Sequence, residues 1–214
     1  MGVRRFVPVA IPVVGLVVLL SLAHGSSSQT SSGTIPAKTP SFQVASCPTA
    51  SSSDHKWAEV SWAMGYGDIP SLTADADLVA LGKITGCPSV GSEEVGAPPV
   101  TSTLYTTYFS FEIESVPYGA ASQPTVVIPQ TGGIVGGKTA EIMDDPLMQT
   151  GDRYVLFLRE ARSGLYVVLG GPPGRFVVRD ELVSSLSAIY PERNIFDQRI
   201  KDMPLGEFVE QVRG

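Results

Sequence analysis

One run of the sequence matches the phosphate-binding loop of nucleotide-binding proteins letter for letter. It reads Gly-Gly-Ile-Val-Gly-Gly-Lys-Thr over residues 132–139 and follows a segment that we predict to be a strand. Such a loop needs a long helix after it, because the N-terminus of that helix faces the phosphates. Pro146 leaves room for only a short helix, and 139–143 reads equally well as a strand. We therefore expect a glycine-rich connection between strands that binds no nucleotide, with Lys138 making no nucleotide contact.

Few residues are suited to acid–base or nucleophilic catalysis. Beyond residue 25 the chain has one histidine, His55, which a Ser-His-Asp triad would have to use, and no Gly-x-Ser-x-Gly motif is present. Glu112 and Glu114 are two residues apart and could suggest the carboxylate pair of a glycosidase. A solvated strand face explains that spacing more simply. We expect no enzymatic activity and no catalytic residues, with a hydrolase that uses acidic residues as the alternative.

Metal ligands are also scarce in this chain. Glu141, Asp144 and Asp145 could contribute to a calcium site, but they lack EF-hand spacing, and an acidic turn accounts for them. Two cysteines and one histidine do not complete a zinc site. The sequence therefore predicts neither a metal site nor a cofactor.

The first 25 residues indicate where the protein works. Arg4 and Arg5 precede an apolar run, 6–23, that ends in small residues, which is the order found in secretory signals. Cleavage before Ser26 is one interpretation. An uncleaved membrane anchor is the other, since the run is just long enough to span a bilayer as a helix. In both cases we expect the rest of the chain to lie outside the cytoplasm, either secreted or held at the membrane by this segment.

The remainder divides by composition into a linker and one domain. Residues 26–46 are rich in Ser, Thr and Pro and have too little apolar content to fold, so we expect a disordered linker. Residues 47–180 are predicted to form a β-barrel domain, and 181–214 a C-terminal helical extension. The net charge is −6 without a basic stripe. That balance argues against nucleic acid, and against a membrane partner other than through the N-terminal segment.

The chain has only two cysteines, Cys47 and Cys87. In an oxidising compartment an isolated pair is most simply a disulfide, and two buried free thiols are the alternative. Closing a loop of about 40 residues would stabilise the fold by roughly 3.5–4 kcal/mol on the chain-entropy model.

Period-two alternation is clearest over 105–113. It places Phe109 and Phe111 inward and Tyr108 and Glu112 outward on a half-buried strand. Between Cys87 and Thr103 a mixture of Gly, Pro, Ser and Glu predicts a loop. Further strands are expected at 78–84, 125–128 (ended by Pro129), 139–143, 154–158, 165–169 and 175–178, the last two forming a hairpin around 170–174.

Helical periodicity is confined to a few segments. A helix over 205–212 follows Pro204, one short helix is expected around 182–189, and Ser71 could cap a single turn before the first strand. Six or so strands with late helix predict a mainly β fold, a small and mainly antiparallel barrel or sandwich. The C-terminal helix completes this fold, and the N-terminal hydrophobic helix precedes it.

Several short motifs occur in a characteristic order over roughly 72–178. They are Ala76–Val79 with Gly82–Ile84, the alternation of 105–114, Gln130–Gly133, Asp145–Leu147, Gly151–Tyr154 with Leu156–Leu158, and Gly174–Phe176. In this order they resemble a family of exported bacterial proteins with no established function. More remotely, the start of the domain is similar to the netrin-like OB barrel of metalloproteinase inhibitors, which implies an OB-like barrel. Those inhibitors chelate zinc through an N-terminal cysteine. Cys47 is not N-terminal after cleavage before Ser26, so we do not expect inhibitory chemistry.

Together these patterns predict an exported, non-enzymatic binding or assembly module of the cell envelope. Its partner would be an unidentified protein or envelope component, not a nucleic acid or a nucleotide. The alternatives are an extracytoplasmic hydrolase and a protease-inhibitor-like barrel.

Overall fold

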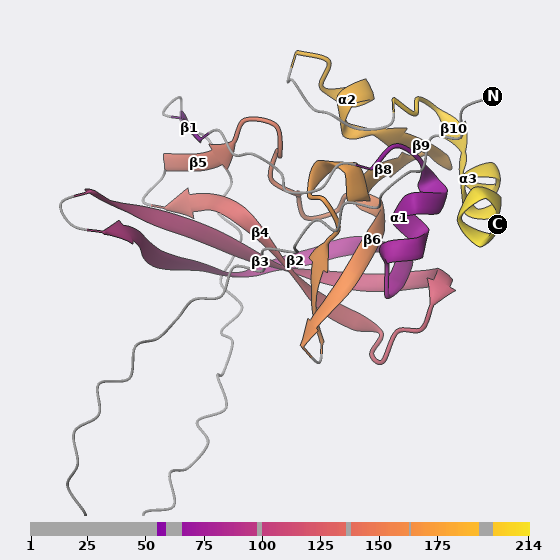
Figure 1. Ribbon diagram of the computed structural model, residues 1–214, viewed down its shortest axis with the longest axis horizontal. Coiled ribbons are helices and arrows are strands. Elements are labelled where there is room, and N and C mark those ends of the chain that lie inside the picture. Colours follow the sequence, from indigo (N-terminus) through magenta and orange to yellow (C-terminus); the bar gives the residue numbers. More distant parts are fainter. Residues whose placement is uncertain (1–54, 59–65, 98–99, 136–137, 163, 193–198) are drawn as a thin grey trace, which may run out of the picture. The chain divides into compact units, whose positions relative to one another are not determined.

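A computed structural model describes residues 55–58, 66–97, 100–135, 138–162, 164–192 and 199–214 (Figure 1). The expected signal or anchor, the linker and Cys47 lie outside the described residues. Within those ranges, no helix is long and apolar enough to cross a membrane.

The described chain is mainly β, with ten strands in one sheet and short helices. The strands are β1 (His55–Ala58), β2 (Leu78–Ala97), β3 (Val100–Gly119), β4 (Thr125–Val135), β5 (Lys138–Ile142), β6 (Arg153–Arg162), β7 (Leu165–Val168), β8 (Arg175–Arg179), β9 (Leu182–Ser185) and β10 (Met203–Pro204). The helices are α1 (Ile69–Asp75), α2 (Leu186–Ile189) and α3 (Leu205–Arg213), with a 3₁₀ turn at Pro172–Gly174.

Five of the strands close into a ring in the order β2, β3, β4, β7, β6 and back to β2. All neighbours in the ring are antiparallel except β4 and β7, which run parallel at Val127 and Leu165. There the amide of Val127 donates to the carbonyl of Gly164 at 2.9 Å. Outside the ring, β8, β9 and β10 continue the sheet from β6, and β5 and β1 continue it from β4.

Alternating residues of β2, β6 and β8 enter two separate hydrophobic cores. Leu78, Leu156 and Val177 belong to the first core, together with Phe111 of β3. The residues between them belong to the second core on the opposite face of the sheet. That core contains Val79, Val155, Phe157, Phe176 and Val178 of the strands, with Ile69 and Leu72 of α1 and Phe208 and Val212 of α3.

The two flanking helices are placed by their apolar residues. Phe208 and Val212 are four residues apart on α3 and are buried, as the periodicity of 205–212 predicts. The ring of Phe208 lies 4.8 Å from that of Phe176, measured between centroids. On α1, Asp68 is the N-cap and accepts a 2.8 Å hydrogen bond from the Ser71 amide. Ser71 therefore lies inside the helix, and its predicted capping role was wrong.

The outer halves of β2 and β3 run together away from α1 and α3 (Figure 1). We call the paired residues Ser89–Ala97 and Val100–Tyr108 the arm. The sequence predicts a loop between Cys87 and Thr103, and that prediction was wrong. Glycine, serine and glutamate are poor strand formers, but here all except Glu93 pair with a threonine or tyrosine of β3, and pairing decides the conformation. Register shifts between Ile84 and Ser89 separate the arm from the ring.

The strand predictions for the remaining chain are confirmed in part. Phe109 and Phe111 are buried and Glu112 is exposed, while Tyr108 is half-buried. β4 continues through Pro129 to Val135, because Pro129 falls between hydrogen-bonding positions of the ladder with β3.

Two expectations for the later strands were wrong. β7 and β8 do not form a hairpin; β7 pairs with β6 and β4, and β8 with β6 and β9. Residues 182–185 are strand β9, so only the second half of the predicted helix over 182–189 is helical. A tight turn at Asp180 and Glu181, both at positive φ, turns the chain from β8 into β9 and explains this.

Candidate functional site

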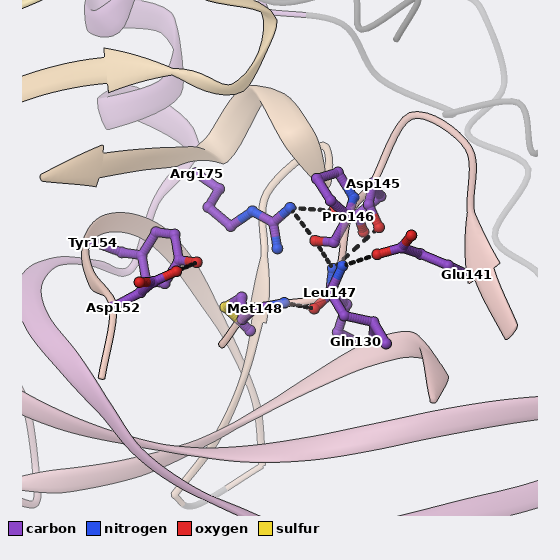
Figure 2. A network of polar contacts seen from close by, with 9 residues as sticks. All are labelled: Gln130, Glu141, Asp145, Pro146, Leu147, Met148, Asp152, Tyr154 and Arg175. Carbon is purple, nitrogen blue, oxygen red and sulfur yellow. Dashed lines mark hydrogen bonds and ion pairs between the residues drawn. The ribbon is translucent and has the colours of Figure 1, made fainter. Parts of the chain in front are cut away.

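The most concentrated group of polar side chains surrounds Arg175 at the start of β8 (Figure 2). Arg175 lies opposite Leu156 in the ladder with β6, on the face that lines the first core, and its side chain is only 3% exposed. A guanidinium cannot lose its proton to become neutral, so its burial requires partners. These come from the segment between β5 and β6.

Asp145 supplies the opposite charge. Its carboxylate lies 2.9 Å from Arg175 Nη2, and it is 8% exposed. The same Nη2 donates to the carbonyl of Pro146 at 2.6 Å. In Figure 2 the guanidinium points at this Asp-Pro peptide, with the ring of Tyr154 on its other side. The Arg175 carbon Cζ is 5.9 Å from the centroid of that ring, close enough for a cation–π contact.

Two further side chains hold the same segment by its backbone. Gln130 of β4 donates to the Pro146 carbonyl at 3.0 Å and accepts from the Met148 amide at 2.9 Å. Glu141 of β5 accepts from the Leu147 amide at 2.6 Å. Residues 145–148 are therefore tied to β4, β5 and β8 at once. Such a buried network rigidifies the structure around it when its members are satisfied.

The electrostatics of this cluster follow from burial. Burial raises the pKa of Asp145, and the facing guanidinium of Arg175 opposes the rise. Burial also raises the pKa of Tyr154, whose hydroxyl donates to Asp152 at 3.1 Å. Arg175 Nε is buried and has no hydrogen-bond partner among the described residues. The charged groups of Arg175 and Asp145 contact each other, and Arg175 also binds the backbone of Pro146.

The acidic residues considered for metal binding make contacts with different partners. Asp145 is paired with Arg175, and Glu141 is bonded to the Leu147 amide. Within the described residues, no three His, Cys, Asp or Glu side chains are grouped as a metal ion would require.

The glycine-rich run lies in a β-hairpin. β4 ends at Val135, β5 begins at Lys138, and these two residues pair in an antiparallel ladder. Gly132 has a φ of +110°, and a side chain there would meet the carbonyl of Ala140 at 2.7 Å. The run therefore lies between two strands only in part: residues 132–135 are the end of β4 and Lys138 and Thr139 the start of β5, because Gly132 allows the two backbones to approach and pair.

A bulge in β3 gives Glu112 and Glu114 different positions in the ladder with β2, in which Glu112 pairs with Lys83. Leu81 pairs with Ser115 and Gly82 with Ile113, so Glu114 falls between paired positions. Arg153 of β6 donates to Glu114 at 2.7 Å and to Glu181 at 2.7 Å. These hydrogen bonds raise the pKa of Arg153. Glu114 is therefore part of an exposed ion pair network that joins β3, β6 and the turn between β8 and β9.

The two cysteines of the predicted disulfide are placed only in part. Cys87 lies on β2 at the register shift between Gly86 and Ser89. Cys47 lies outside the described residues, so the bridge stays a prediction. His55 lies on β1, which pairs in parallel with β5.

Residues from four of the short motifs singled out in the sequence lie together in the cluster around Arg175. Gln130, Asp145 and Arg175 come from three of them, and Asp152 and Tyr154 from a fourth (Figure 2). A scan against models of known protein families finds no match, and a search of curated proteins finds none. The convergence of these motifs was not predicted from sequence, because their order in the chain carries no distances. Its only sequence signal was an arginine directly after Gly-Pro-Pro-Gly and before an apolar run.

Proposed function

We propose that the chain is an exported, non-enzymatic binding or assembly module of the cell envelope, built on an OB-like barrel. The ring has five strands, as an OB barrel has, and its single parallel contact joins the third ring strand in sequence to the fifth. The signal or anchor pattern of residues 1–25 supports an extracytoplasmic location.

The arm is the observation that carries this proposal. In OB barrels the connection between the first and second strands contributes to ligand binding, together with the face of the second and third. The arm is that connection, lengthened into a two-stranded hairpin from Ser89↔Tyr108 to Ala97↔Val100. It carries exposed apolar side chains, with Val90 39% and Leu104 38% exposed. A partner can reach both groups, although Val90 also lies beside Gly133 of β4.

The polar cluster supports binding rather than catalysis. Its buried groups fasten residues 145–148 to three strands, as the hydrogen bonds to Pro146, Leu147 and Met148 indicate. A buried network whose hydrogen bonds hold the backbone makes the ring rigid, and the ring carries the arm. The partner is a protein or envelope component rather than nucleic acid, since the chain is acidic.

A shortened arm provides the test. Replacing residues 92–105 with Asn-Gly joins Gly91 to Thr106 through a tight two-residue turn. Cross-linking in intact cells, with the full chain tagged after Gly214, should recover a specific envelope partner with the native arm and lose it with the short one. Equal recovery by both chains, at equal abundance and unfolding midpoint, would refute a binding role for the arm.

The location is tested separately with the same full chain. A reporter enzyme that is active only in the cytoplasm, fused after Gly214, should remain silent. Activity of that fusion would refute export.

A further inference from the structure

β1 is held to the sheet by a short ladder on one side. It stands at one end of the strand order and pairs with β5 alone among the described strands. The ladder is four residues long, from His55↔Thr139 to Ala58↔Ile142, and it is parallel. Parallel ladders are slightly less stable per residue than antiparallel ones. Among the named helices and strands, only β5 makes extensive contact with β1.

β1 covers an edge of β5 that would otherwise be open. On its other side, β5 pairs with β4 from Val135↔Lys138 to Gly132↔Glu141. Without β1, the amides and carbonyls on the second side of β5 would lack a neighbouring strand, and a row of such groups accepts another strand. We call this side of Lys138–Ile142 the β5 edge. An extended segment that takes the place of β1 can use the same backbone hydrogen bonds.

The fit of β1 to the β5 edge is incomplete at Thr139. The Thr139 side chain is 4% exposed, and its hydroxyl oxygen is buried with no hydrogen-bond partner among the described residues. In the ladder with β4 it pairs with Ile134, which has no polar side-chain atom. Glu141, two residues along on the same face, accepts from the Leu147 amide. The remaining neighbour in the sheet is the position that His55 occupies in β1.

This unpartnered hydroxyl weakens the hold of β1. A buried polar group without a partner costs free energy, because it loses its hydrogen bonds to water and gains none in return. A strand with a suitable polar side chain beside Thr139 would remove that cost, since paired residues of neighbouring strands lie on the same face. The β5 edge can therefore bind another strand more tightly than it binds β1.

We propose that β1 is a displaceable internal strand, and that the β5 edge binds an extended segment of a partner protein in its place. The segment runs parallel to β5 and has a residue with a hydrogen-bonding side chain, such as Asn, beside Thr139. While β1 is paired the edge is covered, so β1 is an autoinhibitory contact. This inference rests on the proposed binding function and adds a second surface with its mode of recognition.

The first test uncovers the edge in the full chain, held in detergent micelles. Consecutive residues of a strand direct their amides to alternate sides, so Lys56→Pro combined with Trp57→Pro removes an amide that faces β5, whichever residue carries it. We call this chain the proline variant. Lys56→Gln combined with Trp57→Phe keeps both amides and is the matched control.

The probe is a fluorescent peptide with the sequence of residues 52–61, which contains β1. Fluorescence anisotropy should show saturable binding to the proline variant. Binding to the matched control and to the native chain should be at least about tenfold weaker, because their own β1 occupies the edge and only a small fraction of the molecules is open. No binding to the proline variant, or equal binding to all three chains, would overturn the proposal.

Two further peptides test the specificity that Thr139 confers. They differ from the first only at the position of His55, where one has Asn and the other Val. The proline variant should bind the Asn peptide about fivefold more tightly than the Val peptide. Adding Thr139→Val replaces the hydroxyl with a methyl group and should bring the two affinities within about twofold. Equal affinities before that change would overturn the role assigned to Thr139.

Amide exchange of the native chain tests displacement without any substitution. Protection in β1 should be at least about tenfold lower than in β6, which has β2 and β8 on its two sides. Equal protection would show that β1 leaves only when the domain unfolds, and would overturn displacement. The proline variant should keep the native protection in β6. Loss of that protection would make β1 an integral part of the fold and would overturn the proposal in the same way.

Cross-linking in cells separates this inference from the function beneath it. The proline variant should capture more of the envelope partner than the native chain. If both capture the same amount, the edge proposal fails and the binding module stands, whereas if neither captures any partner, the binding function itself fails. Sedimentation covers the remaining occupant. A dimer of the native chain that the proline variant cannot form would mean that β1 pairs with β5 of a second copy, and would overturn an external partner.

Discussion

The two halves of the β2–β3 hairpin have the same secondary structure and different surroundings. In the ring, Ile84 and Phe111 face each other and are fully buried, with β6 and β4 on the outer edges. In the arm, Val90 and Leu104 are more than a third exposed. Among the described residues, β4 pairs with the arm only at Thr106, Thr107 and Tyr108, and the rest of the arm pairs between β2 and β3 alone. The ring half is stabilised by burial as well as by pairing, whereas most of the arm is a two-stranded ladder. The two ends of the same hairpin therefore differ in what stabilises them.

The largest expected effect comes from removing a ring side chain. Phe111→Ala should lower the free energy of unfolding by about 3–5 kcal/mol, because it leaves a cavity in the first core. Leu104→Ala in the arm should change it by less than about 0.5 kcal/mol, as at other exposed sites. Urea unfolding of the full chain in micelles, followed by tryptophan fluorescence, measures both. A cost at Leu104 as large as that at Phe111 would contradict the division between ring and arm.

Breaking the buried ion pair should cost nearly as much. Arg175→Met leaves the Asp145 carboxylate buried without its cation, and such losses amount to about 3–5 kcal/mol. Combining it with Asp145→Leu should recover much of the stability, since no charge is then left unpaired. The exposed pair of Arg213 and Glu210 serves as the control, and Arg213→Met should change stability by less than about 0.5 kcal/mol.

The cost of Arg175→Met should also depend on pH. Burial raises the pKa of Asp145 in the folded protein, so the folded state retains the proton more strongly than the unfolded chain. Its stabilising contribution is complete below the unfolded value of about 3.9 and is lost as the pH rises through the folded pKa. The deficit of the variant should therefore shrink toward pH 4, measured relative to the native chain. A deficit that grows on acidification would show that Asp145 is not the buried group responsible.

The predicted disulfide would fasten the junction between the two halves. Cys87 lies at the register shift where the ring ends and the arm begins. If it is joined to Cys47, reduction should lower stability by roughly 3.5–4 kcal/mol on the chain-entropy model, less any strain. Thiol labelling of denatured, non-reduced protein recovered from outside the cell should detect neither cysteine. Quantitative labelling of both would remove the bridge.

The sequence predicted the ring half far better than the arm. Alternation over 105–113 placed Phe109 and Phe111 inward, because burial on one face leaves a direct pattern in the residues. The segment from Cys87 to Thr103 shows no such alternation, and its Gly, Pro, Ser and Glu residues resemble a loop. Only the register with β3 makes it a strand, and a pairing partner is not visible in local composition.

The cluster around Arg175 was missed for a different reason. Gln130, Asp145 and Arg175 are far apart in the chain, and each had a plausible local explanation as part of a turn or strand end. What joins them is the closure of the ring, which brings β4, the segment before β6 and the start of β8 together. The burial of an arginine on the inner face of a strand cannot be inferred until that closure is known.

The smallest expected effect lies at the cap of α1, which belongs to the ring side of the molecule. Asp68 is fully exposed, and the hydrogen bond from the Ser71 amide lowers its pKa. Its stabilising effect should be present above the unfolded value of about 3.9 and lost as the pH falls through the lower folded pKa. The protection of the α1 amides, which is the observed exchange rate relative to the intrinsic rate at the same pH, should therefore fall on acidification, while that of the arm should not.

Asp68→Asn provides the matched control for this cap. Asparagine caps helices about as well as aspartate but does not titrate in this range. The acid-dependent loss of protection in α1 should disappear in Asp68→Asn, while protection at higher pH stays close to that of the native chain. If the variant retains the same acid response, the pH dependence of α1 comes from another group. If the arm responds together with α1, the two halves of the hairpin open as one unit, and the contrast between ring and arm does not extend to their dynamics.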